Sequence, residues 1–386
     1  MTHRAIEVFG AFLKLGLAAF GGPVAHLGYF RDEFVTRRRW LSEEDYADLV
    51  ALCQFLPGPA SSQVGFALGL MRAGWAGAFA AFVAFTAPSA LLLVGLALWA
   101  QGLAGAGAAG VIHGLKLVAV AIVAQAVFGM ARALCPDGPR AGIAAGAILV
   151  LAAVPGPLGM MAAIGIGALA GLALCPSPGA GAAPVPIRIA RRTGIAALAV
   201  FAALFLLLPL LARMGAEGAI LAGFYRAGAL VFGGGHVVLP LLEAETVAPG
   251  WIGADTFLAG YGLAQAVPGP LFTFAGWLGA AGGGPVGAVL ALAGIFAPGF
   301  LLLVGALPFL QALAGRPWAR AAMRGANAAV VGILGLALYD PVATAAIGGR
   351  ADLGLAVLGF VALVMWRVPP WAVVVAGAAA GACLAA

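Results

Sequence analysis

Charged residues are scarce in this 386-residue chain, since Asp, Glu, Lys and Arg together make up 9% of it, whereas soluble domains carry about 25%. Only two lysines occur, Lys14 and Lys116, and the net charge is +6. This composition excludes an ordinary soluble enzyme, a disordered chain and a nucleic-acid-binding protein. The hydrophobic share of 63% and the mean hydropathy of +1.09 indicate an integral membrane protein.

Cysteines and catalytic motifs are equally sparse. The cysteines are scattered without a C-x-x-C pair, which indicates small apolar core residues rather than a disulfide framework or a zinc site. Both lysines are followed by leucine, which excludes a Walker A motif, and H-E-x-x-H and G-x-S-x-G are absent. We therefore expect no metal, no cofactor, no ATP-driven transport by this chain and no enzymatic activity. The cysteines are Cys53, Cys135, Cys175 and Cys383.

What the sequence does contain is a series of long apolar runs. A membrane-spanning helix needs about 20 residues, whereas a transmembrane β-barrel would show short alternating segments. We predict an all-α polytopic membrane protein with roughly ten to twelve crossings. Its 24 prolines and 59 glycines predict broken or closely packed helices. The apolar stretches lie at 5–30, 47–71, 74–100, 109–134, 141–175, 193–213, 218–242, 256–281, 285–311, 319–340, 346–366 and 369–386.

The N-terminal run resembles a signal peptide only in its hydrophobicity. Glu7 and Lys14 interrupt it, and no small-residue cleavage site follows. The end of the run also recurs in the second half of the chain. We therefore interpret it as part of the mature structure.

An internal duplication organises the chain. Five short motifs recur at an offset of 210 to 212 residues, a register that chance would not hold. The sequence therefore predicts two homologous repeats, 1–175 and 193–386, joined by a Pro-, Gly- and Ala-rich linker at 176–192 that ends in arginines. The matching motifs are Phe20-Gly21-Gly22 with Phe232-Gly233-Gly234, Trp40-Leu41 with Trp251-Ile252, Gln54-x-x-Pro57-Gly58-Pro59 with Gln265-x-x-Pro268-Gly269-Pro270, Ala87-Pro88 with Ala297-Pro298, and Gly114-x-Lys116 with Gly325-x-Asn327.

Charge predicts opposite orientations for the two repeats. The loop at 31–39 carries four arginines, whereas its equivalent at 243–255 carries Glu243, Glu245 and Asp255 and no basic residue. By the positive-inside rule these loops lie on opposite sides of the membrane, so we expect inverted-topology repeats. Inverted repeats require an odd number of membrane crossings per repeat. The apolar runs alone do not determine whether that number is odd or even.

The repeated Pro-Gly-Pro motifs are the best candidates for a binding site. Proline removes a backbone donor and interrupts a helix, and a break at membrane depth survives only inside protein or beside a watery cavity. The half-helix that follows points its positive end into that space, which suits an oxyanion. A pair of kinks that only help packing is the alternative, which the duplication disfavours. The candidates are Gln54, Pro57, Gly58, Pro59, Ser61 and Ser62 in the first repeat, and Gln265, Pro268, Gly269, Pro270 and Thr273 in the second.

The glycine motifs are the second candidate, comprising Gly21, Gly22 and Pro23 and then Gly233, Gly234 and Gly235. They permit positive φ or close backbone approach, so a second pair of broken helices and tight helix packing both remain open. His26 and His236 follow them at non-equivalent positions, which argues against a symmetric metal pair. Each histidine either titrates or hydrogen-bonds a carbonyl.

Charged residues inside apolar runs form the third candidate. Lys116 and its repeat equivalent Asn327 are candidate substrate ligands, because a charge at membrane depth is costly. The candidates for a gate or a proton-coupling site are His26, Arg31, Glu33, His236 and Glu245. A solvated loop with a local ion pair is an equal alternative for Arg31, Glu33 and Glu245.

The motifs together are similar to those of the chromate ion transporter family, in its long form with two domains. The resemblance rests on FGGPVAHLGYFRDEFVTRRRWLSEEDYADLVALCQFLPGPASSQVG, on its echo VFGGGHVVLPLLE through LAQAVPGPLFTFAGWLG, and on ANAAVVGILGLALYDP. It implies a multi-pass bacterial inner-membrane carrier that expels chromate, with sulfate as a related or competing anion. It also implies that the Phe-Gly-Gly and Gln-x-x-Pro-Gly-Pro residues matter for transport. Because one chain holds both repeats, we expect a monomer or a homodimer in the lipid bilayer.

Overall fold

The computed structural model describes residues 3–100, 102, 106–175, 187, 189–213, 215–232, 235–313 and 316–385, and all regular structure in these ranges is helical. The first repeat contains α1 (His3–Ala18), α2 (Gly22–Phe30), η1 (Arg31–Arg37), α3 (Glu43–Phe55), α4 (Ala60–Ala100), α5 (Ala106–Leu134), α6 (Gly138–Ala153) and α7 (Pro157–Leu174). Next come α8 (Arg191–Leu211), α9 (Ala216–Leu230), η2 (Gly235–Val237), α10 (Val238–Thr246), α11 (Ala254–Ala266), η3 (Leu271–Thr273) and α12 (Phe274–Leu313). The chain ends with α13 (Pro317–Ala337), η4 (Leu338–Ala343), α14 (Thr344–Ala346), α15 (Arg350–Val364) and α16 (Pro370–Ala385).

The two longest helices, α4 and α12, are each a hairpin of two arms. Gly74 and Gly284 have φ values of 62° and 61°, a left-handed conformation that reverses the chain. Across the first turn, a Cβ placed on Gly69 would lie 2.3 Å from the carbonyl oxygen of Gly77, so the two arms touch backbone to backbone. The first arm of each hairpin is therefore short, and only the second arm is long enough to cross a bilayer.

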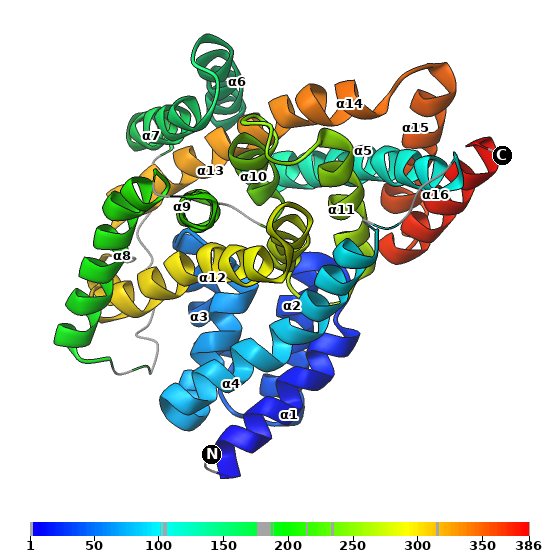
Figure 1. The fold of residues 1–386 in the computed structure, drawn as a ribbon. Coiled ribbons are helices and arrows are strands. Elements are labelled where there is room, and N and C mark those ends of the chain that lie inside the picture. The colour runs from blue at the N-terminus through cyan, green and yellow to red at the C-terminus, as the bar shows by residue number, and fades with distance from the viewer. Residues whose placement is uncertain are drawn as a thin grey trace.

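The repeats exchange their last two helices. Gly114 of α5 packs against the backbone of α16, where a Cβ would lie 2.0 Å from the Gly377 oxygen, and Gly325 of α13 packs in the same way against Gly167 of α7. Figure 1 shows α6 and α7 beside α13, and α15 and α16 beside α5. Side chains could not fit at these crossings, so small residues permit the close helix contacts typical of membrane proteins.

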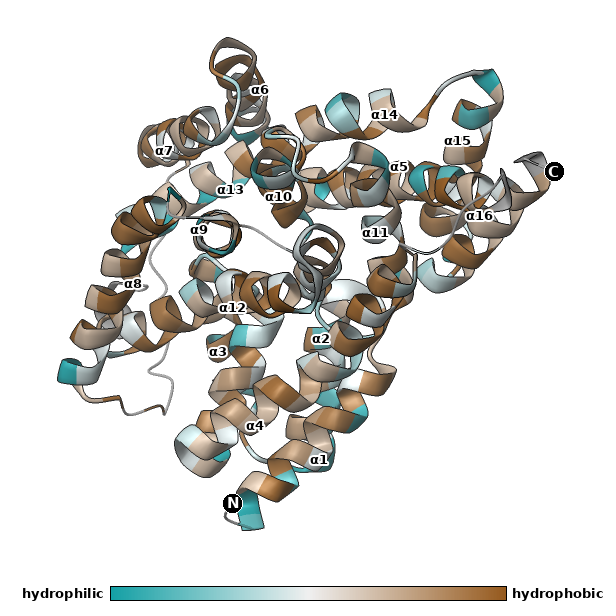
Figure 2. Cartoon of the chain, in the orientation of Figure 1, coloured by the Kyte–Doolittle hydropathy of each residue, from teal (hydrophilic) through white to brown (hydrophobic). Residues whose placement is uncertain are grey.

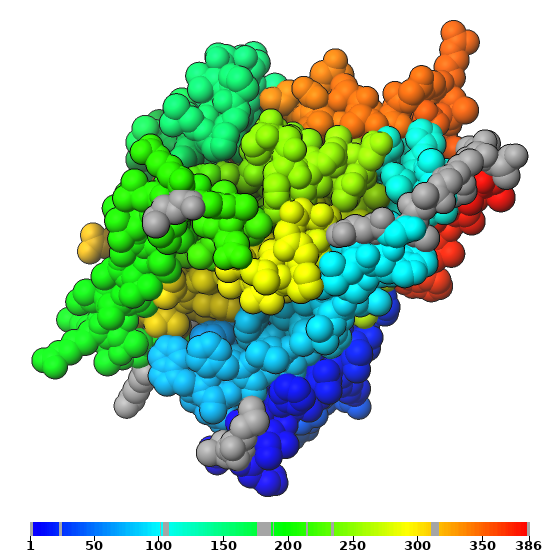
Figure 3. Space-filling model, viewed as in Figure 1, coloured from blue at the N-terminus to red at the C-terminus, as the bar shows by residue number. Residues whose placement is uncertain are grey.

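The second repeat also packs on the first near the middle of the molecule. In the space-filling view the yellow segment of the second repeat lies directly against the cyan segment of the first (Figure 3), and α12 contacts α4. Phe82 on α4 packs against Phe296 and Phe300 on α12, with ring centroids 5.1 and 4.8 Å apart. The predicted division into domains 1–175 and 193–386 stays a prediction. Helices from the two predicted domains pack against each other.

Helix α8 has no counterpart in the first repeat. It is apolar, 21 residues long and largely exposed, which suits a lipid-facing span. Hydrophobic residues dominate the helices, and hydrophilic ones gather at the start of α1 and of α8 (Figure 2). Of the predicted linker, 176–186 and 188 lie outside the described residues.

Among the described residues, six helices or helix runs are long and apolar enough to cross a membrane, fewer than the ten to twelve crossings expected. The apolar stretches 5–30 and 218–242 account for part of the difference. The chain breaks near the middle of both, and each forms two short helical segments.

Candidate anion site at the paired helix breaks

Each repeat contains two breaks of the helical chain. In the first repeat, α1 ends at Ala18 and α2 begins at Gly22, and the first Pro-Gly-Pro motif then separates α3 from α4. In the second repeat, α9 ends at Leu230 before η2, and the second Pro-Gly-Pro motif separates α11 from η3. Gly58 and Gly269, at the centres of the two motifs, have φ values of 121° and 107°. We call the four breaks together the cradle.

Reciprocal hydrogen bonds join the breaks of the two repeats. The Gly58 N–H donates to the Val231 carbonyl at 2.8 Å, and the Gly269 N–H donates to the Ala19 carbonyl at 3.0 Å. Val231 and Ala19 are equivalent residues, each directly before its Phe-Gly-Gly motif. Each Pro-Gly-Pro motif is therefore bonded to the residue just before the Phe-Gly-Gly motif of the other repeat, so the breaks of the two repeats lie side by side.

A second reciprocal contact packs each Pro-Gly-Pro motif on the long arm of the opposite hairpin. A Cβ on Gly58 would lie 2.9 Å from the Cα of Gly299, and a Cβ on Gly269 would lie 2.7 Å from the Ser89 hydroxyl. Gly299 and Ser89 follow the equivalent prolines Pro298 and Pro88. These prolines lie fourteen residues beyond the hairpin turns, or about 21 Å at 1.5 Å per residue along the long arms.

Helical segments begin at all four breaks, with α2 at Gly22, η2 leading into α10, α4 at Ala60 and η3 leading into α12. The first amides of a helix have no acceptor within it, and its N-terminal end carries a partial positive charge. Four such ends surround the cradle. The arrangement attracts an anion without a charged side chain.

Several buried side chains beside the cradle have polar atoms without a hydrogen-bond partner among the described residues. They are Ser62 Oγ, Gln63 Oε1 and Thr86 Oγ1. The Gln63 amide donates to the Pro57 carbonyl at 3.0 Å and to the Gly299 carbonyl at 2.9 Å, which ties the first break to α12. Ser61 is also buried. Unpartnered polar groups are costly to bury, so these atoms indicate a place for a polar ligand or water.

The two repeats differ in their predicted polar residues. Gln54 is exposed at the end of α3, whereas Gln265 is half-buried and its Nε2 has no acceptor within the described ranges. The Thr273 hydroxyl donates to the Pro270 carbonyl at 2.7 Å, a local bond that its equivalent Ser62 does not make. In the second repeat the Thr273 hydroxyl is thus used in a local hydrogen bond to the backbone. In the first repeat the Ser62 hydroxyl is not used in this way.

Both histidines lie at the glycine motifs. His26 Nε2 donates to the Ala19 carbonyl at 3.2 Å, and this same oxygen accepts from Gly269. His236 Nδ1 shares a 2.7 Å hydrogen bond with the Tyr261 hydroxyl. The other nitrogen of His236 lies 4.0 Å from where a Cβ on Gly22 would be, so the glycine motif of the first repeat faces the histidine of the second.

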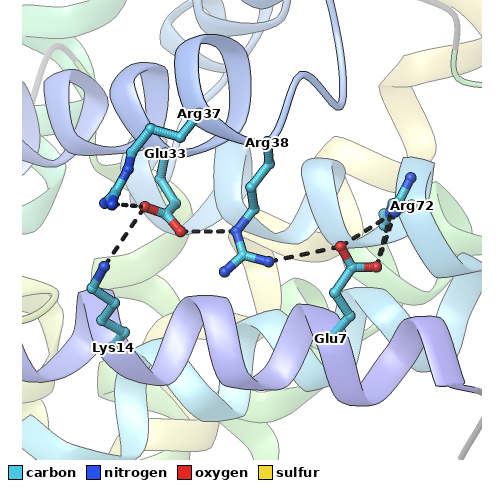
Figure 4. A network of polar contacts seen from close by, with 6 residues as sticks. All are labelled: Glu7, Lys14, Glu33, Arg37, Arg38 and Arg72. Carbon is cyan, nitrogen blue, oxygen red and sulfur yellow. Dashed lines mark hydrogen bonds and ion pairs between the residues drawn. The ribbon is translucent and has the colours of Figure 1, made fainter.

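The candidate gating carboxylates form ion pairs. Glu33 is buried and contacts Arg38 at 2.8 Å, Arg37 at 3.1 Å and Lys14 at 3.9 Å (Figure 4). Burial raises the pKa of Glu33, but the Arg38 hydrogen bond and the three positive charges outweigh it, so the pKa lies below its usual value. Arg38 also contacts Glu7, and Glu7 pairs with the Arg72 guanidinium at 2.9 Å (Figure 4). This chain of charges, which we call the Glu7–Glu33 network, ties α1, η1 and the α4 turn together.

Among the described residues, the equivalent carboxylate in the second repeat, Glu245, pairs with one cation. Glu245 accepts both hydrogen bonds of the Arg226 fork, at 2.6 and 2.5 Å. Lys14 and Arg226 stand in the same register of the duplication as Glu33 and Glu245, 212 residues apart. Arg31 pairs with Glu43 on the exposed surface and does not join either carboxylate.

Lys116 and Asn327 lie on α5 and α13 rather than at the breaks. The Lys116 ammonium contacts Asp255 at 2.7 Å and donates to the Ala345 carbonyl at 3.1 Å. Asp255 is in the first turn of α11, whereas Gln265 is at its last turn, about 15 Å away along the helix. The Asn327 Oδ1 is buried without a partner in the described part of the chain.

Gly233 and Gly234 lie outside the described residues, and Gly235 and Pro23 lie at the starts of η2 and α2.

Sequence reasoning missed three features of this region. Tyr261 carries no motif, and the carbonyls of Ala19 and Val231 have no side-chain signature. The Lys14–Glu33 and Arg226–Glu245 pairs did leave a signal, because all four residues keep the register of the duplication. Their spacing and complementary charges were sufficient to predict a repeated ion pair.

A duplicated, all-helical chain with paired helix breaks has an architecture typical of membrane transporters. The family model described as "Chromate transporter" matches residues 6–172 and 218–382, so it covers both repeats and omits α8. This chain belongs to the chromate transporter family.

Three similar proteins bear names that agree with the family. A "Chromate transport protein" of Pseudomonas aeruginosa is 30% identical over 86% of this chain and 80% of its own length. A "Probable chromate transport protein" of Synechococcus elongatus is 29% identical over 92% and 88%. A "Chromate transport protein" of Cupriavidus metallidurans is 27% identical over 86% and 81%. No solved structure matches the chain significantly.

Proposed function

We propose that the protein exports chromate across the bacterial inner membrane as a secondary transporter and so confers chromate resistance. The supporting observation is the convergence of four helix starts at two reciprocal Pro-Gly-Pro clamps. A tetrahedral dianion fits such a cradle because backbone amides and hydroxyls can donate hydrogen bonds to its oxygens. No permanently charged side chain is then needed. Sulfate shares this shape and charge and is the expected competing substrate.

Connectivity supports inverted topology for the repeats. In the first repeat α1 and α2, α3 and the first arm of α4, and α6 and α7 each form a pair that enters and returns. The long arm of α4 and α5 cross once each, so the repeat ends on the side where it began. Helix α8 then supplies the single crossing that inverts the second repeat.

The arginine distribution agrees with this topology. The Glu7–Glu33 network and the start of α8, with Arg191 and Arg192, fall on one side, which the positive-inside rule assigns to the cytoplasm. The acidic loop before α11 then faces outward. With α8 included, the number of crossings before the second repeat is odd, as inverted repeats require. The apolar runs alone did not determine whether this number is odd or even.

The membrane potential can drive this export without ATP. Moving one charge through 100 mV is worth about 2.3 kcal/mol, so a dianion leaving a negative interior gains about 4.6 kcal/mol. Proton exchange is a further possible contribution. The transporter works as a monomer or a homodimer in this proposal.

Paired glycine variants test the cradle. Gly58→Ala places a methyl 2.9 Å from the Gly299 backbone, whereas Gly156→Ala changes the glycine of a third Pro-Gly-Pro segment where nothing lies within 4 Å. Both glycines have positive φ, so backbone strain is matched. We expect Gly58→Ala to abolish chromate transport in oriented vesicles with a clamped potential, and Gly156→Ala to retain it. Equal transport by both variants at equal membrane levels would overturn the site.

The same vesicles separate export from its rival, uptake of sulfate or another oxyanion on the same scaffold. With the orientation known, a potential that is negative on the cytoplasmic side should drive labelled chromate outward. Flux that enters against that potential, coupled to a cation, would support the uptake carrier.

A further inference from the structure

We propose that His26 is a proton-binding site linked to the anion, and that its Nδ1 takes up one proton when a tetrahedral oxyanion occupies the cradle. This inference rests on the proposed function and makes the proton a co-transported ion in place of an exchanged one, so that one net negative charge leaves and the membrane potential contributes half of what the bare dianion would gain. The proton comes from water on the side where the anion loads, and it returns to water when the anion leaves.

The hydrogen bonds of His26 define which ring nitrogen is vacant. The ring is fully buried, and its Nε2 contacts the Ala19 carbonyl at 3.2 Å. A carbonyl oxygen only accepts, so Nε2 carries the hydrogen and the lone pair is on Nδ1. Nδ1 has no partner among the residues that the structure describes. A basic nitrogen is therefore buried without a protein partner in the described part of the chain.

His26 is joined to the cradle through a single oxygen. The Ala19 carbonyl accepts from both His26 and Gly269, the central residue of the second Pro-Gly-Pro motif. The imidazole and the second Pro-Gly-Pro break therefore share one hydrogen-bond acceptor. A positive charge on the imidazole would lie close to the break where the anion would bind. At that distance in a low-dielectric interior, the anion and the proton stabilise each other.

The surroundings of His26 supply no other counter-charge. On α4 the Phe85 ring meets the imidazole edge-on, 5.3 Å between centroids, and the stretch 73–100 contains no charged residue. The titratable groups on neighbouring elements are Tyr46 of α3, which donates to the Leu27 carbonyl, His236 beside Gly22, and Glu33 of η1, which its cations neutralise. An imidazolium here therefore depends on the bound anion for neutralisation.

The duplication predicts one such proton per molecule. The residue equivalent to His26 in the second repeat is Val238, which cannot titrate. His236 is displaced by two positions, and its Nδ1 is already engaged by Tyr261. Among the described residues, His26 Nδ1 is the fully buried imidazole nitrogen without a hydrogen-bond partner, whereas the Nε2 of His236 lies beside Gly22.

Calorimetry on the full-length protein tests the link. Chromate binding is measured at one pH in two buffers of different ionisation enthalpy, which counts the protons taken up. Because protonation of chromate itself is common to all variants, a difference between variants belongs to the protein. We expect wild type to take up about one more proton per chromate than His26→Gln. His113→Gln, whose ring pairs with Asp352, is the control and should match wild type.

Equal proton uptake by wild type and His26→Gln overturns the inference while the proposed function stands. Absence of chromate binding by wild type overturns the proposed function instead. If His26→Gln does not fold, ring-¹⁵N spectra of the wild type decide. Chromate should shift one histidine to the imidazolium form, and four unchanged histidines would overturn the proposal.

Discussion

The two repeats share a backbone design but not their chemistry. In both, a Pro-Gly-Pro amide donates to the carbonyl just before the other repeat's Phe-Gly-Gly motif, and a carboxylate faces a cation on an earlier helix. The side chains around this frame diverge, with Gln63 opposite Phe274 and His26 opposite Val238 in the alignment of the repeats. Symmetric backbone therefore holds the cradle, and one repeat supplies most of its polar side chains.

The two carboxylate clusters differ in the same way. Glu33 contacts three cations within the Glu7–Glu33 network, whereas Glu245 has Arg226 alone among the described residues. The network links three elements on the side that the arginines mark as cytoplasmic. In the proposed transport cycle the two sides of the cradle would therefore open at different free-energy costs.

The largest expected effect tests whether the repeats interlock equally. Gly114→Val and Gly325→Val would each place a side chain about 2 Å from an opposing backbone oxygen, at Gly377 and Gly167. We expect each to destabilise the protein by about 1–3 kcal/mol or more, through overpacking. Thermal unfolding in detergent measures this. Gly335→Val, on α13 with nothing within 4 Å, is the control, and similar melting of all three would contradict the exchanged-helix arrangement.

A second prediction concerns the polar asymmetry at the breaks. Gln63→Leu removes the amide that binds the Pro57 and Gly299 carbonyls, so it should cost about 1–3 kcal/mol and lower chromate transport. Unfolding and vesicle flux are measured together. Gln125→Leu, the same change on α5, controls for the loss of an amide. Unaltered stability and flux in Gln63→Leu would show that this cross-repeat tie is dispensable.

The smallest expected effect is a pH dependence in the Glu7–Glu33 network. The pKa of Glu33 is lowered in the folded protein, so its contribution to stability is present above the unfolded value near 4.5 and is lost as the pH falls through the lower folded value. Glu33→Gln should reduce the stability at pH 7 by about 0.5–1.5 kcal/mol and flatten the acid limb of the melting profile. Glu44→Gln, an exposed change on α3, should leave the profile unchanged. A steep acid limb that persists in Glu33→Gln would contradict the assignment.

The duplication was predictable from sequence and is confirmed by the two matched regions. The helix breaks were predictable because proline and glycine act on their own backbone, and Gly58 and Gly269 carry the positive φ that such motifs favour. The roles of the site residues remain predictions. Gln54 and Gln265 illustrate why, because equivalent residues in the alignment lie in different environments, one exposed and one half-buried.

Long-range partners were not predictable. The acceptors of the Pro-Gly-Pro amides are the carbonyls of Ala19 and Val231, and any residue type offers a carbonyl. Lys116 entered the candidate site because of its charge in an apolar run, but its partner, Asp255, is distant in sequence. Hydropathy also does not distinguish a re-entrant pair of short helices from one spanning helix, so the number of crossings remains a prediction.

Helix α8 carries a consequence for how such a transporter can be assembled. On the proposed topology it is the only element that turns the second copy upside down, and neither matched region includes it. A gene encoding a single repeat would lack this adaptor. It could rebuild the same reciprocal clamp only from two polypeptides inserted in opposite senses, whereas fusion through α8 fixes both senses within one translation product.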